Sequence, residues 1–176
     1  MVKIIQIGDE RLRTVCEPIS VLEIDSPKTK QILKDLSEAL RSQDDGVAIS
    51  APQIGVTKRV FAVSTKIFDE DYLAGEPEKK FYEHIYFINP KITKFSAKTE
   101  EMEEGCLSIR GVYGLVKRPK NVSLEALNEK GEKIVRGAGG LLARIFQHEI
   151  DHLDGILFID KASVIKEIPE EKINDK

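Results

Sequence analysis

The sequence predicts one domain of the α+β class, because two amphipathic helical segments flank a run of short strands joined by turns. The helical segments are residues 26–44 and 139–153, and most strand-like segments lie between them. A chain of 176 residues suits one domain with a single hydrophobic core. We see no repeat, low-complexity tract or linker. We therefore assign residues 1–165 to a single catalytic domain and residues 166–176 to a charged tail.

The first 25 residues are expected to form an extended arm with turns. In the helix that follows, Ser26 can cap the N-terminus and Pro27 suits the first helical position. The sequence Asp44-Asp45-Gly46 ends this helix. Its apolar residues recur at helical spacing and predict one buried face, formed by Ile32, Leu33, Leu36, Ala39 and Leu40.

The middle of the chain alternates between loops and strands. Residues 46–55 are loop-like with a glycine at each end, and residues 64–83 are polar enough for a long surface loop. Asn89-Pro90 predicts a turn between two strands, and residues 128–131 predict another. The predicted strands are residues 59–63, 85–88, 91–95, 113–117, 122–127 and 133–135.

The second helix is expected to end at Gly155. A short final strand follows at residues 156–159. The segment from Lys166 is charged and contains Pro169, which predicts a short helix or frayed coil.

The composition is that of an ordinary soluble protein, with 41% hydrophobic and 32% charged residues. A net charge of -3 without a basic block disfavours binding to nucleic acid or to an anionic membrane. The apolar runs are too short to span a bilayer, and the N-terminus resembles neither a secretory signal nor a transit peptide. We therefore expect a cytoplasmic protein, in which Cys16 and Cys106 stay reduced. Cys16 is expected to be a packing residue.

The second helix carries the sequence QHEIDH at residues 147–152. His148 and His152 are one helical turn apart on the same face, so both imidazoles can reach one metal ion. Glu149 can then lie beside that ion and move a proton of a water molecule. The pattern predicts a catalytic metal site.

The same spacing also occurs on surface helices, where the histidines face water. Two observations argue against that reading. The chain has only three histidines, and two of them are in this motif. The helix is also apolar on two sides, which predicts that it is mostly buried, and buried histidines need partners. One side is formed by Leu142, Phe146, Ile150 and Leu153, and the other by Leu141 and Ile145.

Two histidines leave a catalytic metal short of a third protein ligand. The candidates are His84, a carboxylate downstream and Cys106. Cys106 follows a glycine that allows close approach of the backbone, and its thiolate is a strong ligand for zinc or ferrous iron. We prefer Cys106, with packing as its alternative role.

Three segments together resemble the peptide deformylase family. GVAISAPQIG at residues 46–55 resembles the family motif Gly-x-Gly-Leu-Ala-Ala-x-Gln. EGCLS at residues 104–108 and QHEIDHL at residues 147–153 match the second and third family motifs intact. The likeness extends in order to about Asp160, and the three motifs together are highly specific.

The resemblance implies mixed, mostly antiparallel strands wrapped around a central helix that carries the His-Glu-x-x-His motif. It also implies that Cys106, His148 and His152 hold the metal and that Glu149 is the general acid and base. Gln53 and the backbone N–H of Leu107 would bind the oxyanion. The methionine pocket and peptide-binding wall would comprise Gly46, Val47, Ala48, Gly105, Leu141, Arg144 and Ile145, with Arg144 contributing its aliphatic stem.

The implied activity is hydrolysis of the formyl group from the N-terminal formyl-methionine of newly made polypeptides, a step of protein biosynthesis. The cofactor would be one divalent metal ion, with Fe2+ first and Zn2+, Ni2+ or Co2+ as alternatives. The expected partners are N-formyl-methionyl nascent peptides, with the ribosome as a candidate.

Two positions depart from the family pattern. Ala48 replaces the second glycine of the first motif, and Ser50 and Ala51 follow where the family has two alanines. In the family this backbone pairs with the substrate, so the methyl group of Ala48 is expected to crowd the peptide. Arg110 replaces a proline found in many relatives, near the mouth of the site.

Two other functions fit parts of the sequence. A zinc peptidase would use His-Glu-x-x-His to cleave internal peptide bonds, but it would have no use for the EGCLS segment. A deformylase-like metal-binding protein with weak or altered activity would have no use for Glu149 and Gln53. Activity towards formyl-Met-Ala, compared with acetylated or internal peptides, separates the three.

Overall fold

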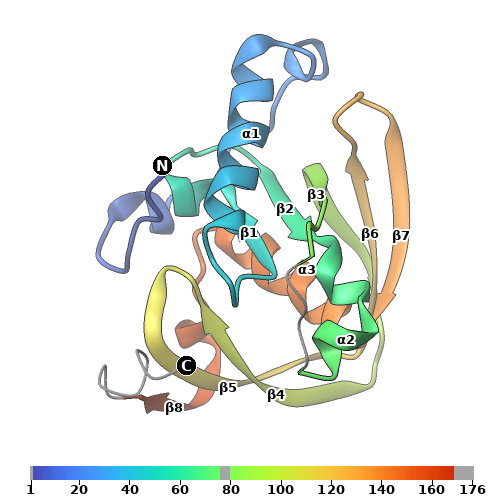
Figure 1. Ribbon diagram of the computed structural model, residues 1–176. Helices are drawn as coiled ribbons and strands as arrows, with labels where there is room; N and C mark the ends of the chain where they lie inside the picture. The colour runs from blue at the N-terminus through green and yellow to red at the C-terminus, as the bar shows by residue number, and fades with distance from the viewer. Residues whose placement is uncertain (1, 76–79, 169–176) are drawn as a thin grey trace.

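A computed structural model of the chain describes residues 2–75 and 80–168. Its strands form two sheets, and all pairings between the named strands in these residues are antiparallel (Figure 1). The five-stranded sheet has the order β1-β2-β3-β6-β7 and the three-stranded sheet has the order β4-β5-β8. The strands are β1 (Ala48–Ser50), β2 (Val60–Ser64), β3 (His84–Phe95), β4 (Thr99–Cys106), β5 (Ile109–Pro119), β6 (Asn121–Leu127), β7 (Lys133–Gly139) and β8 (Ala162–Glu167). The α+β class and the mostly antiparallel pairing are confirmed.

The first helix, α1 (Pro27–Arg41), begins where the sequence predicts. The hydroxyl of Ser26 accepts a hydrogen bond from the Thr29 N–H at 3.2 Å, and all five predicted apolar residues are buried. The helix ends at Arg41, three residues earlier than expected, and Ser42 is its C-cap.

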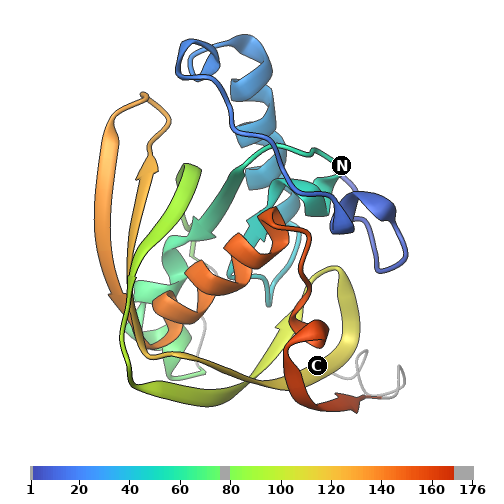
Figure 2. The same ribbon diagram turned by 180° about the vertical axis from the view of Figure 1, so that it is seen from behind.

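The second long helix, α3 (Gly140–Leu153), packs against strands of both sheets (Figure 2). Its Phe146 meets Phe87 of β3 edge to face, with ring centroids 5.0 Å apart, and Phe87 stacks on Phe61 of β2. These rings are essentially unexposed, so α3 is fixed against the larger sheet by apolar burial. Cys16 is also buried in this cluster, as predicted.

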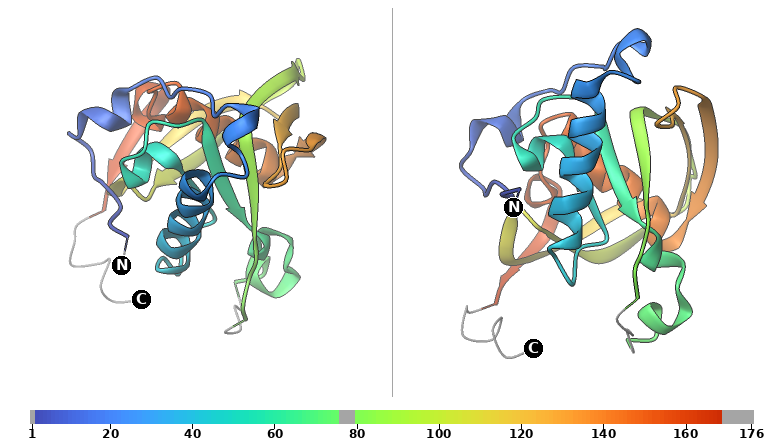
Figure 3. Two further views of the ribbon diagram at one scale, coloured as in Figure 1. Left: turned by 90° about the horizontal axis from the view of Figure 1, so that it is seen from above. Right: turned by 45° about the horizontal axis from the view of Figure 1, so that its top comes forward.

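Gly155 ends the turn after α3 with a φ of 74°. A Cβ atom at this position would lie 2.5 Å from the carbonyl oxygen of Arg13, so the close approach of the N-terminal arm requires glycine. The remaining helical segments are short: η1 (Glu10–Arg13), η2 (Val21–Glu23), η3 (Ala51–Ile54), η4 (Thr65–Phe68), α2 (Glu70–Leu73) and η5 (Phe158–Asp160). Figure 3 shows α1 beside β2 in two further views.

Several predicted elements were wrong. The two strands around Asn89 are one strand, β3, because Asn89 adopts a φ of 51° and the strand continues through a shift of register. The predicted strand at residues 156–159 was wrong, because the Asp160 carboxylate accepts a hydrogen bond from the Leu157 N–H and η5 forms there. Lys166 and Glu167 belong to β8 rather than to a helix or coil, and the tail at residues 169–176 lies outside the described residues.

The predicted loops also contain regular structure. Residues 46–55 include β1 and η3, and residues 64–83 include η4 and α2. Strand β4 was not predicted, because half of its residues, TEEMEEGC, are glutamates and most of its side chains are exposed. Within the described ranges, no helix has both the length and the apolar character needed to cross a membrane.

Candidate active site

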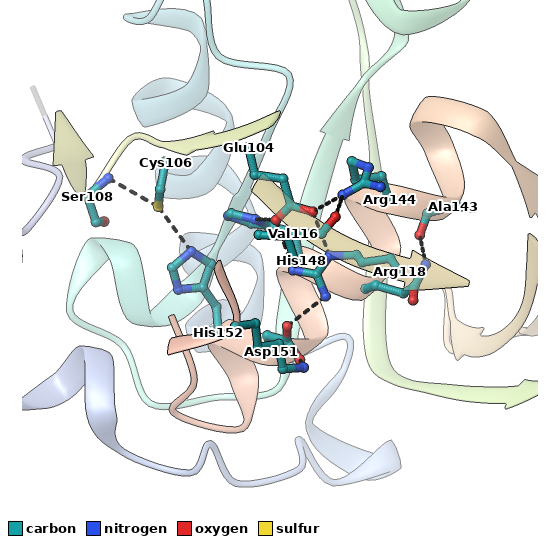
Figure 4. Close-up of polar contacts among 12 residues, drawn as sticks. Glu104, Cys106, Ser108, Val116, Arg118, Ala143, Arg144, His148, Asp151 and His152 are labelled. Atoms are coloured by element: carbon teal, nitrogen blue, oxygen red, sulfur yellow. Dashed lines mark hydrogen bonds and ion pairs between the residues drawn. The ribbon is translucent and has the colours of Figure 1, made fainter. Parts of the chain in front are cut away.

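Cys106, His148 and His152 come together in the structure, although Cys106 is 46 residues from His152 in the sequence (Figure 4). The sulfur of Cys106 lies 3.2 Å from Nε2 of His152. One ligand atom from each of the three residues lies within 4.8 Å of the others. In residues 2–75 and 80–168 this is the one group of three such side chains that could hold a metal ion. We term these three residues the ligand cluster.

The hairpin between β4 and β5 positions the thiol. Cys106 pairs with Ile109, so Leu107 and Ser108 form a tight turn. Gly105 precedes the thiol, and the ring of Tyr113 occupies the space a Cβ atom would need, at 2.9 Å. Gly105 therefore allows the two strands to close beside α3.

Glu104 orients His148. Nδ1 of His148 donates to Oε2 of Glu104 at 3.0 Å, which leaves Nε2 as the nitrogen available to a ligand. Burial raises the pKa of Glu104, but hydrogen bonds from Arg118 and His148 outweigh it and hold the pKa well below its usual range. The carboxylate is therefore ionised and acts as a fixed acceptor for the imidazole.

Glu104 is part of a buried cluster of charges. Arg118 donates to both of its carboxylate oxygens, at 2.6 and 2.9 Å, and to Asp151 at 2.8 Å. Arg144 donates to Oε1 of Glu104 at 2.5 Å and to the Val116 carbonyl. Lys161 completes the cluster by donating to Asp151 at 2.6 Å. These contacts offset the cost of burying the charges and hold Glu104 in one position.

His152 is 1% exposed. Burial, with the nearby charges of His148 and Arg118, lowers its pKa well below the usual range, so the ring is neutral. A neutral imidazole beside a thiol is the form that binds a metal ion.

Glu149 is also buried, at 4% exposure. Burial raises its pKa to about 7, against the opposing charge of His148. A carboxyl group with this pKa can accept and release a proton near neutral pH.

Gln53 is held in one orientation by Ser50. Its Oε1 accepts from the backbone N–H of Ser50 at 2.9 Å and from the Ser50 hydroxyl at 3.0 Å. The amide NH2 group therefore faces Cys106, 3.4 Å from the sulfur, and Ser108, 3.2 Å from its hydroxyl oxygen. A fixed N–H donor is thus directed towards the ligand cluster.

The ligand cluster lies at a cleft of about 370 Å³. Arg144 lines the cleft, but its guanidinium group is engaged by Glu104 and backbone carbonyls. All seven residues predicted for the substrate pocket line this cleft, together with Gln53, Cys106, Leu107, His148 and Glu149; they are Gly46, Val47, Ala48, Gly105, Leu141, Arg144 and Ile145. His152 is buried and does not itself line the cleft.

His84, the alternative third ligand, is elsewhere. Its Nδ1 lies 2.8 Å from the hydroxyl of Ser37, and it is not part of the ligand cluster.

The donors present fit a divalent metal. A thiol and two imidazoles form the kind of three-ligand set that leaves one position open. Oε2 of Glu149 and Nδ1 of His152 are buried polar atoms without a hydrogen-bond partner among the described residues. An unsatisfied carboxylate oxygen beside the ligand cluster is expected where a water molecule or substrate is to be bound.

The sequence reasoning missed the residues that support these groups. Glu104 is in the EGCLS segment, and a carboxylate two residues before a metal ligand was the available signal. Arg118 gave no signal, because an arginine in a strand is usually exposed, whereas this one is 4% exposed. Ser50 was noted only as a departure from the family motif.

Comparisons with known proteins show which family the chain belongs to. The family model for polypeptide deformylase matches residues 1–167. Peptide deformylase 2 of Clostridium acetobutylicum is 45% identical over 152 residues, which covers 86% of this chain and 89% of the relative. The peptide deformylase of Carboxydothermus hydrogenoformans is 41% identical and covers 93% and 94% of the two chains.

A solved structure is similar over almost the same length. The class I type b peptide deformylase from Acinetobacter baumannii, crystallised with Met-Ala-Ser bound, has a TM-score of 0.78 and 32% identity, covering 91% of this chain and 97% of that one. The sequence match spans both the hairpin that carries Cys106 and the helix that carries the two histidines. This chain therefore belongs to the polypeptide deformylase family.

Proposed function

We propose that this chain removes the formyl group from newly made polypeptides through a metal ion held by Cys106, His148 and His152. Family membership over nearly the whole chain supports the activity: the protein is a peptide deformylase, a hydrolase of protein biosynthesis. The observation that carries the site assignment is the cluster of three ligand atoms within 4.8 Å at a cleft.

The donors favour a soft or borderline divalent ion. A thiolate and two imidazoles suit Fe2+, and Zn2+, Ni2+ or Co2+ can occupy the same ligands. When bound, the ion supplies Lewis-acid chemistry, which acidifies water and polarises a carbonyl group. Glu104 supports this assignment because it fixes the His148 ring with Nε2 free.

Glu149 is the general base and acid in this proposal. Its pKa of about 7 allows it to take a proton from the attacking water and to deliver a proton to the leaving amine. The unpartnered Oε2 leaves an acceptor available for that water.

Gln53 and Leu107 stabilise the negative charge that develops on the formyl oxygen. Ser50 holds the Gln53 amide so that its N–H donors face Cys106 and Ser108. The backbone N–H of Leu107 follows directly after the Cys106 ligand in the hairpin turn. Donors that are fixed before the reaction stabilise a transition state more than donors that must reorient.

The substrate lies in the cleft between Gly46, Val47 and Ala48 on one side and Gly105 on the other. Its methionine side chain occupies the apolar part bordered by Leu141, Ile145 and the stem of Arg144. The binding of Arg144 to Glu104 supports this, because it turns the charged group away from an apolar pocket.

We also propose the position of α3 in the fold, the bounds of the catalytic domain and the place where the enzyme acts. Helix α3 is the central helix around which the strands are wrapped, supported by nine buried residues along it. Residues 1–165 belong to one catalytic domain, which strand β8 extends to Glu167. Because the substrate is a nascent polypeptide, the enzyme acts in the cytoplasm and meets its substrate at the ribosome.

The test is formate release from formyl-Met-Ala by anaerobically purified protein, with the metal content measured in parallel. We expect one metal ion per chain, formate release from formyl-Met-Ala, and no release of acetate or free amine from acetyl-Met-Ala. Cleavage of an internal peptide bond would instead indicate a peptidase. Bound metal without formate release would overturn the enzymatic assignment.

A further inference from the structure

Arg110 bridges the rim of the cleft. It is the second residue of β5 and lines the cleft together with Asp45. Its Nη1 donates to Oδ2 of Asp45 at 2.7 Å, and its Nη2 donates to Oε1 of Gln43. One guanidinium group therefore connects the β4–β5 hairpin to the loop on the opposite side.

That loop, residues 42–47, joins α1 to β1, and we term it the wall loop. It is fixed at two further points: Lys66 Nζ donates to the Asp44 carbonyl at 2.9 Å, and the Ser64 N–H donates to the Val47 carbonyl at 2.9 Å. Both of these contacts come from the β2–η4 side. Arg110 supplies hydrogen bonds to the wall loop from the β4–β5 hairpin, across the cleft.

The wall loop also packs against the hairpin turn. A Cβ atom at Gly46 would lie 3.2 Å from Cδ1 of Leu107 and 3.0 Å from the Cβ of Gln43. A displacement of Gln43 or Asp45 would therefore loosen the packing between Gly46 and Leu107. The position of the wall loop and the shape of the cleft are thus linked.

We propose that Arg110 is a positioning residue that clasps the wall loop to the β4–β5 hairpin and thereby sets the affinity of the cleft for its peptide. This rests on the proposed function. Without the clasp, the wall loop must become ordered when the peptide binds, and that entropic cost weakens binding. Glu149 and Gln53 have other supports, and the turn that carries the Leu107 N–H is held by Gln6, which donates to the Leu107 carbonyl at 3.1 Å. The chemical step is therefore unaffected.

The expected size of the effect on KM depends on how exposed the Arg110–Asp45 ion pair is. The side chain of Arg110 is 39% exposed and that of Asp45 is 65% exposed, so water screens their attraction. The second bond, to Gln43, adds directional restraint. We expect loss of both bonds to raise KM about three- to tenfold, with kcat within about twofold of wild type.

The experiment compares Arg110→Met, Arg110→Lys and Asp45→Asn with wild type. Hydrogen exchange of the amides at residues 43–47 is measured in the free protein, and kcat and KM are measured with formyl-Met-Ala. Arg11→Met is the matched control, because Arg11 pairs with Asp9 at 2.6 Å, has a side chain that is 50% exposed, and does not line the cleft.

If Arg110 holds the wall loop, hydrogen exchange of the amides at residues 43–47 should be faster, and KM higher, in Arg110→Met than in wild type. The same changes should be smaller in Arg110→Lys and Asp45→Asn, and absent in Arg11→Met. Wild-type exchange rates or a wild-type KM in Arg110→Met would overturn the proposal, as would a fall in kcat at constant KM. If wild type releases no formate, the proposed function fails, and the exchange rates alone decide whether the clasp exists.

Discussion

Glu104 of β4 and His148 of α3 are joined by a hydrogen bond of 3.0 Å between Oε2 and Nδ1. The bond connects the smaller sheet to the helix and determines which nitrogen of His148 faces the ligand cluster. Since two arginines also bind Glu104, the carboxylate has little freedom to move.

This relationship predicts that Glu104→Gln weakens metal binding. The amide cannot reproduce a charged acceptor for His148, and Arg118 loses its paired charge. Loss of such a supporting group typically lowers metal affinity about 10- to 100-fold. Competition with a calibrated chelator measures the change, and unaltered affinity would show that Glu104 does not orient the ligand.

Replacing Glu149 separates metal binding from turnover. Glu149→Ala should keep its metal but lose formate release, because the proton acceptor is gone while the three ligands remain. We expect kcat to fall by about 100- to 10,000-fold. Metal content and kcat are measured on the same preparation. Loss of metal would mean that Glu149 had been assigned the wrong role.

Gln53→Met tests the proposed oxyanion donor. Removal of one such donor should lower kcat about 100- to 1000-fold while the cleft stays filled. Ser50→Ala is the companion variant: it removes one of the two bonds to Oε1 of Gln53, so its effect should be smaller and in the same direction. A larger effect of Ser50→Ala would contradict this ranking.

His84 should make the fold less stable in acid. Burial, with the charges of Arg41 and Lys66, lowers the pKa of His84 to about 4 from an ordinary value of 6.5. The unfolded chain therefore binds a proton first, so stability is fully present above pH 6.5 and falls between pH 6.5 and 4.

The loss attributable to His84 should be about 1–2 kcal/mol after allowance for solvent screening. Urea denaturation of metal-free protein at several pH values, for wild type and His84→Asn, measures it. Asparagine can still bond to Ser37 but does not titrate in this range. Equal pH slopes for the two proteins would rule His84 out as the cause.

The sequence predicted which residues lie together at the candidate site better than it predicted the strands. His148 and His152 are separated by one helical turn, so local geometry alone places them together. Cys106 and Gln53 reach them only through tertiary structure. Cys106 was chosen for its thiolate and the glycine before it, whereas Gln53 was identified only through a motif that resembles a family. Leu141 and Ile145 were placed at the cleft by the same resemblance, since buried apolar residues look alike in sequence.

The missed elements have physical reasons. Strand β4 has charged, exposed side chains, so the alternation that marks a half-buried strand is absent. β3 contains Asn89-Pro90, a common turn sequence, but Asn89 bonds to both the N–H and the carbonyl of Ile19, which holds the strand through the bend. Neither Arg118 nor Arg110 could be assigned partners before the chain was folded.

The placement of Cys106 on a hairpin and of the two imidazoles on a helix has a consequence for how the protein matures. An ion held by all three is a cross-link between segments that are far apart in the sequence. Such an ion binds the native chain but not the unfolded chain. Metal binding therefore raises the melting temperature, and the rise grows with the logarithm of the free metal concentration. A cell starved of metal would therefore hold a population that is inactive and also a better substrate for its proteases.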